Sequence, residues 1–389
     1  MGTDDHAEQP VEGVAPGVHR SRGGRQDRPA PATVRSRRSA AGPSIGVVYA
    51  GSGLGRALAT HLVADGARVV GLDVRRGDVP GVTWRVGDPA HPDLVRRLGG
   101  LDVLVHPAAE TAGDEDRQGR AVRRVRACQT ALTAAAAAGV PRVVVVTSAM
   151  VYGARPDNPV PLDEDAPLLA APDDSVAGDL LEVEELVARA RELHPGLTVT
   201  VVRPALVVGP GVDTFRTRHF AAPRLLVVKD TRPLWQFAHV DDVASAVAWS
   251  ALGRVAGEVL TVGCAGYLTQ EQVEEHVGLG RIELPSRVAT ATAERLHRIG
   301  VTAAPASDLA YSSWPWVVSS ARLRAAGWRP AFDNSAALQV LLEDVRGRFA
   351  VGGRRMPARE AALGAAGTTV AVLSTAAVVR QVRRQRRGG

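Results

Sequence analysis

Three glycines and an aspartate carry the clearest chemical signal in the sequence. The run IGVVYAGSGLGRALATHL, residues 45–62, predicts a strand, a glycine turn and a helix in that order. Gly51, Gly53 and Gly55 allow a tight turn that a pyrophosphate can approach, and the helix start behind it offers free N–H groups. A second predicted strand, ARVVGLDV, ends in Asp73, where a carboxylate can accept both hydroxyls of an adenosine ribose. Together these features predict a dinucleotide site.

Two arginines after Asp73 keep the choice of dinucleotide open. The aspartate favours NAD, because its carboxylate binds free ribose hydroxyls. Arg75 and Arg76 follow directly and could instead hold the 2′-phosphate of NADP. We therefore expect NAD, with NADP as the alternative. The competing structural interpretation is an ordinary turn between a strand and a helix, with an incidental exposed aspartate.

From residue 44 onward, short valine-rich runs alternate with helical segments rich in Ala, Leu and Arg. This order predicts a Rossmann-type doubly wound α/β fold, in which helices cover both faces of a parallel sheet. A further helix is expected in DDSVAGDLLEVEELV, residues 173–187, with Asp173, Asp174 and Ser175 as candidate caps. The predicted strands are IGVVYA, ARVVGLDV, VTWRVGD, LDVLVHPAA and RVVVVTSAM.

The composition excludes several classes of protein. With 389 residues, 45 % of them hydrophobic, the chain can bury a sizeable core. The net charge of +6 comes from arginine, because Lys229 is the only lysine, and many arginines lie in the two tails. We therefore expect no nucleic-acid partner. Cys128 and Cys264 are too far apart to suggest a metal cluster and too few for a disulfide framework, so we expect no metal and a cytoplasmic location.

The two ends of the chain differ from its middle. Residues 1–43 are rich in Gly, Pro, Arg and Asp without an apolar period, which predicts a disordered tail. Residues 44–350 are expected to form one domain, with a smaller C-terminal α/β substrate lobe mainly at 210–330. Residues 351–389 predict an apolar helix with a basic end. Its uncharged part, 361–379, could just cross a bilayer, so an anchor on the cytoplasmic face of a membrane competes with a loosely packed soluble helix.

Further motifs follow in a fixed order. Gly87 and Asp88 end the third predicted strand, and LVHPAAE, VVVVTSAMVYG, PLDEDAPL, VVRPALVVGPG, QFAHVDDVASAV and SSARLRAAGWRPAF come after them. With these motifs, residues 44–350 resemble the extended short-chain dehydrogenase/reductase family, the NAD-dependent epimerase/dehydratases. The resemblance implies oxidoreductase or isomerase chemistry on a small-molecule substrate. It also implies a homodimer that pairs through the two helices flanking the active site.

The resemblance assigns roles to residues near the ends of the strands. Asp88 would lie against the adenine ring, and Ala108 and Ala109 would pass under the cofactor ribose. Ser148 matches the family's catalytic Ser/Thr, which hydrogen-bonds the substrate oxygen beside the nicotinamide. Arg203–Pro204 matches the turn that packs beside the nicotinamide end.

Two departures from the family bear on the ligand. The glycine turn is one residue shorter than the usual TGxxGxxG, so the phosphate cradle must differ. Trp235 stands where many members place an arginine on a nucleotide-sugar pyrophosphate, which makes a sugar nucleotide less expected. The segment from His239 to Asp242 would close the substrate lobe. His239 itself is interpreted as a structural histidine, with titration near neutrality as the alternative.

A third departure removes the proton-transfer groups. In the family a YxxxK motif begins the helix that continues into a K-L-E-x-E-like run. Matching LLEVE at 180–184 places Val176 at the tyrosine and Leu180 at the lysine. No YxxxK exists elsewhere, because the tyrosines stand at positions 49, 152, 267 and 311 and the only lysine is Lys229. The chemistry needs a phenol whose pKa a neighbouring ammonium lowers, and valine and leucine cannot supply either group.

Ser148, Tyr152 and Asp179 remain as candidates for catalysis. Tyr152 follows Ser148 by four residues, where the family usually packs its tyrosine. Asp179 adjoins the lost lysine position, where desolvation would suit it to acid/base work, although a solvated or capping carboxylate is the alternative. Two interpretations stay open: an NAD(P)-dependent oxidoreductase or epimerase with altered acid/base residues, and a non-catalytic dinucleotide-binding sensor or scaffold. The aliphatic and aromatic replacements predict an apolar ligand such as a lipid or isoprenoid.

Overall fold

The computed structural model describes residues 42–51, 53–108, 122–222, 224–299 and 304–345, together with two short strands at 349–351 and 354–356. No helix within these ranges is long and apolar enough to cross a membrane. The anchor predicted at 361–379 lies outside them, as does the predicted N-terminal tail up to residue 41.

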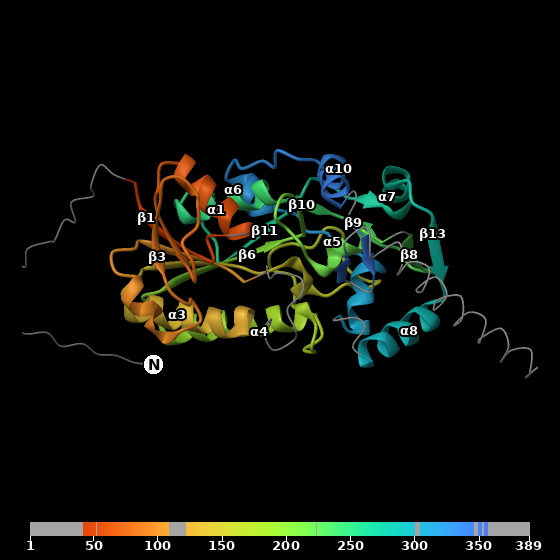
Figure 1. Cartoon of the computed structure of the whole chain (residues 1–389), viewed down its shortest axis with the longest axis horizontal. Coiled ribbons are helices and arrows are strands. Elements are labelled where there is room, and N and C mark those ends of the chain that lie inside the picture. The colour runs from red at the N-terminus through yellow and green to blue at the C-terminus, as the bar shows by residue number, and fades with distance from the viewer. Residues whose placement is uncertain are drawn as a thin grey trace, which may run out of the picture. The chain divides into compact units, whose positions relative to one another are not determined.

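A seven-stranded parallel sheet forms the centre of the fold (Figure 1). Its strands are β1 Ser44–Val48, β2 Arg68–Asp73, β3 Val82–Val86, β4 Val103–Pro107, β5 Arg142–Val146, β6 Thr198–Pro204 and β11 Val259–Val262. They lie in the order β11-β6-β5-β4-β1-β2-β3, with every neighbouring pair parallel. The strand order reverses between β1 and β4, which is where doubly wound folds bind their ligands. The predicted Rossmann-type fold is confirmed.

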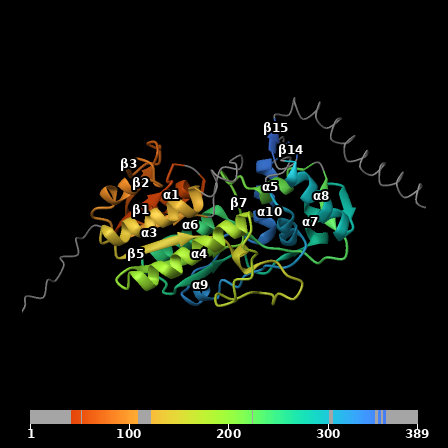
Figure 2. The ribbon, with the colours of Figure 1, turned by 90° about the horizontal axis from the view of Figure 1, so that it is seen from below.

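Helices cover both faces of this sheet, because strands buried on both sides need two apolar layers. They lie above and below the sheet in Figure 1, and those on one face stand in front of it in Figure 2. Helices α1 Gly53–Ala64 and α6 Val240–Ala251 pack together on one face. Helices α3 Ala127–Ala137 and α4 Val176–Leu193 pack on the other. Leu54, Leu58 and Leu62 of α1 recur at the helical spacing of four and are fully buried.

Helix α4 begins where the sequence predicted a cap. The Ser175 side chain accepts a hydrogen bond of 3.0 Å from the backbone N–H of Gly178, which satisfies a donor that the helix itself leaves unpaired. A cap of this kind contributes about 1 kcal/mol. The cap therefore fixes where the first turn of α4 starts.

The smaller C-terminal α/β region that the sequence predicted is also present. Strand β7 Leu206–Val208 pairs with β10 Phe237–His239, β8 Leu225–Val228 pairs with β13 Arg281–Leu284, and β9 Leu234–Trp235 pairs with β12 Leu268–Thr269. Its helices are α5 Phe215–His219, α7 Gln270–Val277, α8 Ser286–Arg298, α9 Ala321–Ala325 and α10 Asn334–Val345. Short helical turns are η1 Pro92–Arg97, η2 Val122–Arg126, η3 Ala149–Tyr152 and η4 Ala306–Ser312.

The helix expected from residue 351 does not begin there. Strands β14 Phe349–Val351 and β15 Arg354–Met356 form an antiparallel pair instead. Residues 357–389 lie outside the described ranges. The prediction rested on composition alone, which cannot separate a short strand from the start of a helix.

A buried histidine lies in the middle of the large sheet. His106 belongs to β4, whose five residues are all buried. Neither of its ring nitrogens has a hydrogen-bond partner among the residues that the structure describes. Burial lowers the pKa of His106 to about 4, so the ring is neutral at pH 7.

This shifted pKa predicts a pH-dependent stability. Between about pH 6.5 and 4 the unfolded chain binds a proton on His106 that the folded chain does not bind, so the free energy of unfolding falls as the pH drops. The contribution is complete above pH 6.5 and is lost by about pH 4, for a total of about 3 kcal/mol. Urea unfolding at pH 7 and pH 4.5 should show a smaller loss for His106→Leu than for the unmodified protein. Equal losses would contradict this assignment.

Candidate active site

Five residues that the sequence assigned to the cofactor or to catalysis meet at one edge of the sheet. Gly51, Asp73, Ala108, Ser148 and Pro204 stand at or directly after the carboxyl ends of β1, β2, β4, β5 and β6. Because the strands are parallel, these ends lie side by side. The sheet therefore positions the candidate cofactor residues and the candidate catalytic serine along the carboxyl ends of its strands.

The glycine turn and Asp73 are joined directly. The backbone N–H of Gly51 donates to one carboxylate oxygen of Asp73 at 2.9 Å, and the N–H of Val74 donates to the other at 2.7 Å. A Cβ on Gly51 would stand 3.0 Å from the Asp73 carboxylate. Each carboxylate oxygen keeps a second lone pair, so the group is held in place and can still accept two ribose hydroxyls.

The turn also brings helix α1 against the end of β1. A Cβ on Gly55 would lie 2.0 Å from the carbonyl oxygen of Tyr49, so only glycine permits this approach. Tyr49 has a φ of 54° and Gly53 a φ of 52°. The left-handed conformation costs a non-glycine residue roughly 1–2 kcal/mol. A Cβ on Gly211 would lie 3.5 Å from the Cα of Gly53, which places the loop after β7 beside the turn.

These observations fit a dinucleotide. The start of the twelve-residue helix α1 supplies backbone N–H groups and the positive end of a helix dipole for a pyrophosphate. The glycines keep the backbone surface free of side chains there, and Asp73 stands where an adenosine ribose would lie. The shortened turn thus retains the features that a phosphate cradle requires.

The remaining cofactor candidates differ in their surroundings. Arg75 and Arg76 are exposed beyond the end of β2. Asp88 is exposed, and its carboxylate accepts a 2.9 Å hydrogen bond from the N–H of Ala90. Ala108 is buried directly after β4. Ala109 lies outside the described residues.

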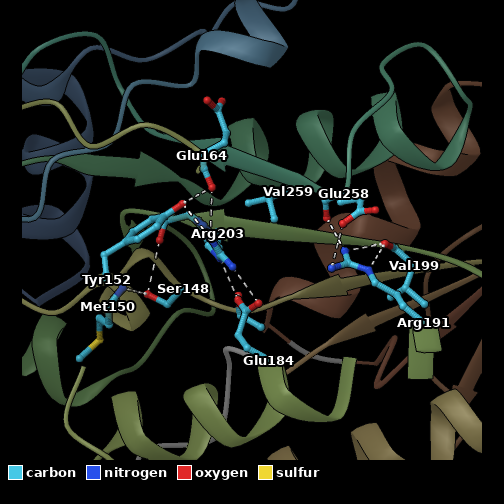
Figure 3. Close-up of polar contacts among 12 residues, drawn as sticks. Ser148, Met150, Tyr152, Glu164, Glu184, Arg191, Val199, Arg203, Glu258 and Val259 are labelled. Atoms are coloured by element: carbon cyan, nitrogen blue, oxygen red, sulfur yellow. Dashed lines mark hydrogen bonds and ion pairs between the residues drawn. The ribbon is translucent and has the colours of Figure 1, made fainter. Parts of the chain in front are cut away.

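Arg203 is the centre of a buried polar network (Figure 3). Its guanidinium donates to both carboxylate oxygens of Glu184, each at 2.9 Å, and to the hydroxyl of Tyr152, also at 2.9 Å. Thr147 donates to the same Glu184 carboxylate at 2.8 Å. Only 7 % of the Arg203 side chain and 6 % of the Glu184 side chain are exposed. The Arg203 side chain therefore joins β6 to α4 within the core, a contact that the sequence did not reveal.

Tyr152 is engaged by this network. It is fully buried, accepts from Arg203, and donates to the carbonyl oxygen of Glu164 at 3.2 Å. The Arg203 guanidinium also lies 4.9 Å from the centre of its ring. Burial raises the pKa of Tyr152, which opposes proton transfer near neutral pH. Its surroundings thus favour the packing role over a catalytic one.

Ser148 is held less tightly. Its hydroxyl accepts a 3.2 Å hydrogen bond from the N–H of Met150, which caps η3, and donates to the carbonyl oxygen of Pro204 at 3.4 Å (Figure 3). The donated bond is long for an O–H···O contact, whose usual length is about 2.7–2.8 Å. A rotation of the hydroxyl would therefore cost little and would present its proton to another acceptor.

Asp179 lies in a buried ion pair. Its carboxylate is 3.2 Å from the guanidinium of Arg124 in η2, and the two side chains are 11 % and 4 % exposed. The solvated carboxylate that the sequence allowed is therefore not observed. Sequence reasoning missed Arg124 because the two residues are 55 positions apart.

The two positions matched to the family's tyrosine and lysine lie in the first turns of α4. Leu180 is fully buried in the apolar layer that α3 and α4 form beneath the sheet, and Val176 is partly buried beside it. Trp235 is buried, donates to Gln270 at 2.8 Å and stacks on His219 with 5.7 Å between ring centres.

His239 caps α6 and is packed by aromatic and acidic neighbours. Its ring accepts a 3.2 Å hydrogen bond from the N–H of Asp241 and stacks on Phe332 at 3.7 Å. Burial lowers its pKa. The Asp242 carboxylate accepts from the backbone N–H groups of Ala331 and Phe332 at 2.7 and 3.1 Å. These contacts agree with the structural interpretation of His239.

The Arg203 network predicts a large loss of stability when the guanidinium is removed. Arg203→Met leaves the Glu184 carboxylate buried without its counter-charge, which should lower the free energy of unfolding by about 3–5 kcal/mol. Arg189→Met is a matched control on the same helix as Glu184, because Arg189 pairs with Glu185 and both side chains are exposed, and it should cost less than about 1 kcal/mol. Urea unfolding measures both. Similar losses in the two variants would mean that burial does not set the strength of the Arg203 pair.

Comparison with known proteins places this geometry in a family. The NAD dependent epimerase/dehydratase family matches residues 50–263 of the chain. The match begins just before the glycine turn and ends after β11. It therefore includes the turn and every strand of the large sheet except β1, which lies before it.

Two curated relatives share 26 % and 30 % of their aligned residues with this chain. An uncharacterised protein of Mycobacterium tuberculosis is 26 % identical over 247 residues, which cover 62 % of this chain and 65 % of that protein. A 4-hydroxy-2-methyl-3-oxo-4-farnesyl-3,4-dihydroquinoline-1-oxide ketoreductase of Stigmatella aurantiaca is 30 % identical, over 54 % of this chain and 66 % of its own. The chain thus spans just under two thirds of the length of these curated relatives.

A solved structure shows the same fold. The dTDP-glucose 4,6-dehydratase of Streptomyces venezuelae, solved with NAD bound, has a TM-score of 0.60 at 22 % identity. The likeness covers 78 % of this chain and 97 % of that one. The shared fold therefore extends from the large sheet into the C-terminal region.

Proposed function

Because the chain belongs to the NAD-dependent epimerase/dehydratase family, we propose that it binds NAD without using the tyrosine and lysine of that family for proton transfer. The backbone N–H groups at the start of α1, from Gly53 to Gly55, hold the pyrophosphate, and the Asp73 carboxylate, fixed by the Gly51 N–H, holds the adenosine ribose. NAD supplies hydride transfer when it is bound. The residues of this chain bind the cofactor and orient it. Arg75 and Arg76 are the contacts that would instead support NADP.

One observation argues against the family's usual proton transfer and carries the proposal. Leu180 is fully buried in an apolar layer, and Val176 stands one turn before it. Neither side chain can give or take a proton. The two buried tyrosines are committed elsewhere, since Tyr152 bonds Arg203 and Glu164, and Tyr311 donates to the carbonyl oxygen of Met150 at 2.7 Å. Burial raises the pKa of both phenols. A dinucleotide-binding sensor or scaffold is the function that these features support best.

A second candidate is a reductase with altered acid/base residues. The weakly held hydroxyl of Ser148 favours it, because that group can turn toward a substrate oxygen. The relative from Stigmatella aurantiaca, a ketoreductase by name, adds support. In this version Ser148 binds the substrate oxygen and water supplies the proton, because the Asp179 carboxylate is already paired with Arg124.

The ligand of either version is a small molecule of apolar character. Trp235 occupies the position of the pyrophosphate-binding arginine and is buried against His219 and Gln270. The name of the ketoreductase relative includes a farnesyl group, whereas the solved dehydratase acts on a sugar nucleotide. The absence of a cation at position 235 favours the apolar class.

Calorimetric titration of the full chain with NAD, NADH, NADP and NADPH tests the binding site. We expect one oxidised and reduced pair to bind at micromolar strength, with NAD and NADH preferred. Gly51→Val should abolish binding, because its side chain would meet the Asp73 carboxylate and fill the cradle. Ser148→Ala, the control directly after β5, should change the affinity by less than about twofold. If both variants lose binding equally, the assignment fails.

Turnover separates the two candidates. With NADH and a panel of ketones, the sensor or scaffold should show no change in absorbance at the reduced nicotinamide band. Sustained NADH oxidation that disappears in Ser148→Ala would overturn the non-catalytic proposal and support the reductase. Binding without turnover would leave the proposal in place.

A further inference from the structure

The C-terminal region contains a cavity of about 230 Å³ that is partly open to solvent. It lies between α5, β8, β13, α8 and η4, which gather together in Figure 1. Its walls are mostly aliphatic. They include Leu226, Val228, Leu284, Ala289, Ala293 and Leu296.

Helix α8 presents one apolar face to this cavity. Ala289, Thr292, Ala293 and Leu296 line it, and their spacing of three and four residues places them on one side of the helix. Ala291 belongs to the same helix, does not line the cavity and is exposed. The small side chains at 289 and 293 leave the space that larger residues would fill.

The polar end of the cavity carries no net charge. Arg218 donates to both carboxylate oxygens of Asp213, at 2.8 and 2.9 Å. Arg216 donates to Ser312 at 3.0 Å and to the carbonyl oxygen of Asp308, and it lies 3.9 Å from the Asp308 carboxylate. The two arginines are thus balanced by two aspartates. A diphosphate would have to break one of these pairs, whereas a neutral hydroxyl or carbonyl group would not.

The cavity is connected to the sheet edge. Arg216 lies over the Tyr311 ring, 5.0 Å from its centre, and the Tyr311 hydroxyl bonds the carbonyl of Met150. The N–H of Met150 in turn bonds the hydroxyl of Ser148. One wall of the cavity therefore contacts the turn that presents the candidate catalytic serine.

We propose that this cavity binds a neutral apolar molecule with a single hydroxyl or carbonyl group, such as a medium-chain alcohol or a short isoprenoid, and that it does not bind a diphosphate. The volume supports this class, because an apolar cavity of about 150 Å³ holds a benzene ring, and the same scale gives roughly nine carbon atoms here. This inference rests on the proposed function, because it specifies the chemical class of the small apolar ligand proposed there.

Calorimetric titration of the full chain with octan-1-ol, and separately with sodium pyrophosphate, tests the inference. Octan-1-ol should bind at one site. Ala293→Phe, which fills the cavity, should weaken this binding at least tenfold, and Thr292→Trp on the same face of α8 should do likewise. Ala291→Phe, the matched control on the exposed side, should leave it within twofold. Thermal unfolding confirms that each variant is folded.

Two results would overturn the inference: no binding of octan-1-ol to the unmodified protein, or equal binding to Ala293→Phe and Ala291→Phe. Pyrophosphate binding that Ala293→Phe weakens and Gly51→Val leaves unchanged would also overturn it, because that pattern places a diphosphate in the cavity and not at the glycine turn. Titration with NAD keeps the two proposals apart, since all three α8 variants should bind NAD as the unmodified protein does. Loss of octan-1-ol binding with retained NAD binding places the effect in the cavity.

Discussion

The pairing of Arg203 with Glu184 is the interaction on which the arrangement at the carboxyl ends of the strands depends. It joins the end of β6 to the middle of α4, and the same guanidinium reaches Tyr152 in the turn after β5. Removing these groups from water is costly, and the cost is offset only when every donor and acceptor has a partner. The network therefore allows one placement of α4 against the sheet. That placement sets where Val176, Asp179 and Leu180 stand relative to Ser148.

The sequence predicted the large sheet well because its signals are local. Valine-rich runs bounded by turn residues become the strands, and the glycine turn at Gly51 is followed by a helix as expected. The partners of buried polar side chains are a different matter. Arg203, which the resemblance places beside the nicotinamide end, bonds Glu184, and Asp179 pairs with Arg124 in a distant segment. Local pattern carries no information about contacts between residues 19 or 55 positions apart.

The glycine turn and the first turns of α4 differ in how much stability the sequence gives up. The glycine turn keeps costly features, including Tyr49 at a φ of 54° and a helix start that only glycine at position 55 permits. The first turns of α4, in contrast, carry the side chains that best suit a buried apolar layer. A buried lysine at position 180 would pay a desolvation cost that leucine avoids. The chain thus retains strain at the proposed dinucleotide site and carries apolar side chains at the positions matched to the family's proton-transfer groups, which separates the proposed binding from catalysis in physical terms.

The C-terminal region completes this argument. A ligand that fills the cavity beside α8 binds only the folded form, so it stabilises the packing of α8, β8 and η4 by mass action. Tyr311 of η4 also bonds Met150 in the turn that Ser148 caps. One buried tyrosine thus joins the cavity wall to the carboxyl ends of the strands by direct contact. The cavity and the proposed cofactor site are distinct in chemistry, one apolar and neutral and the other built from backbone N–H groups, yet η3 and η4 join their surroundings by direct contact.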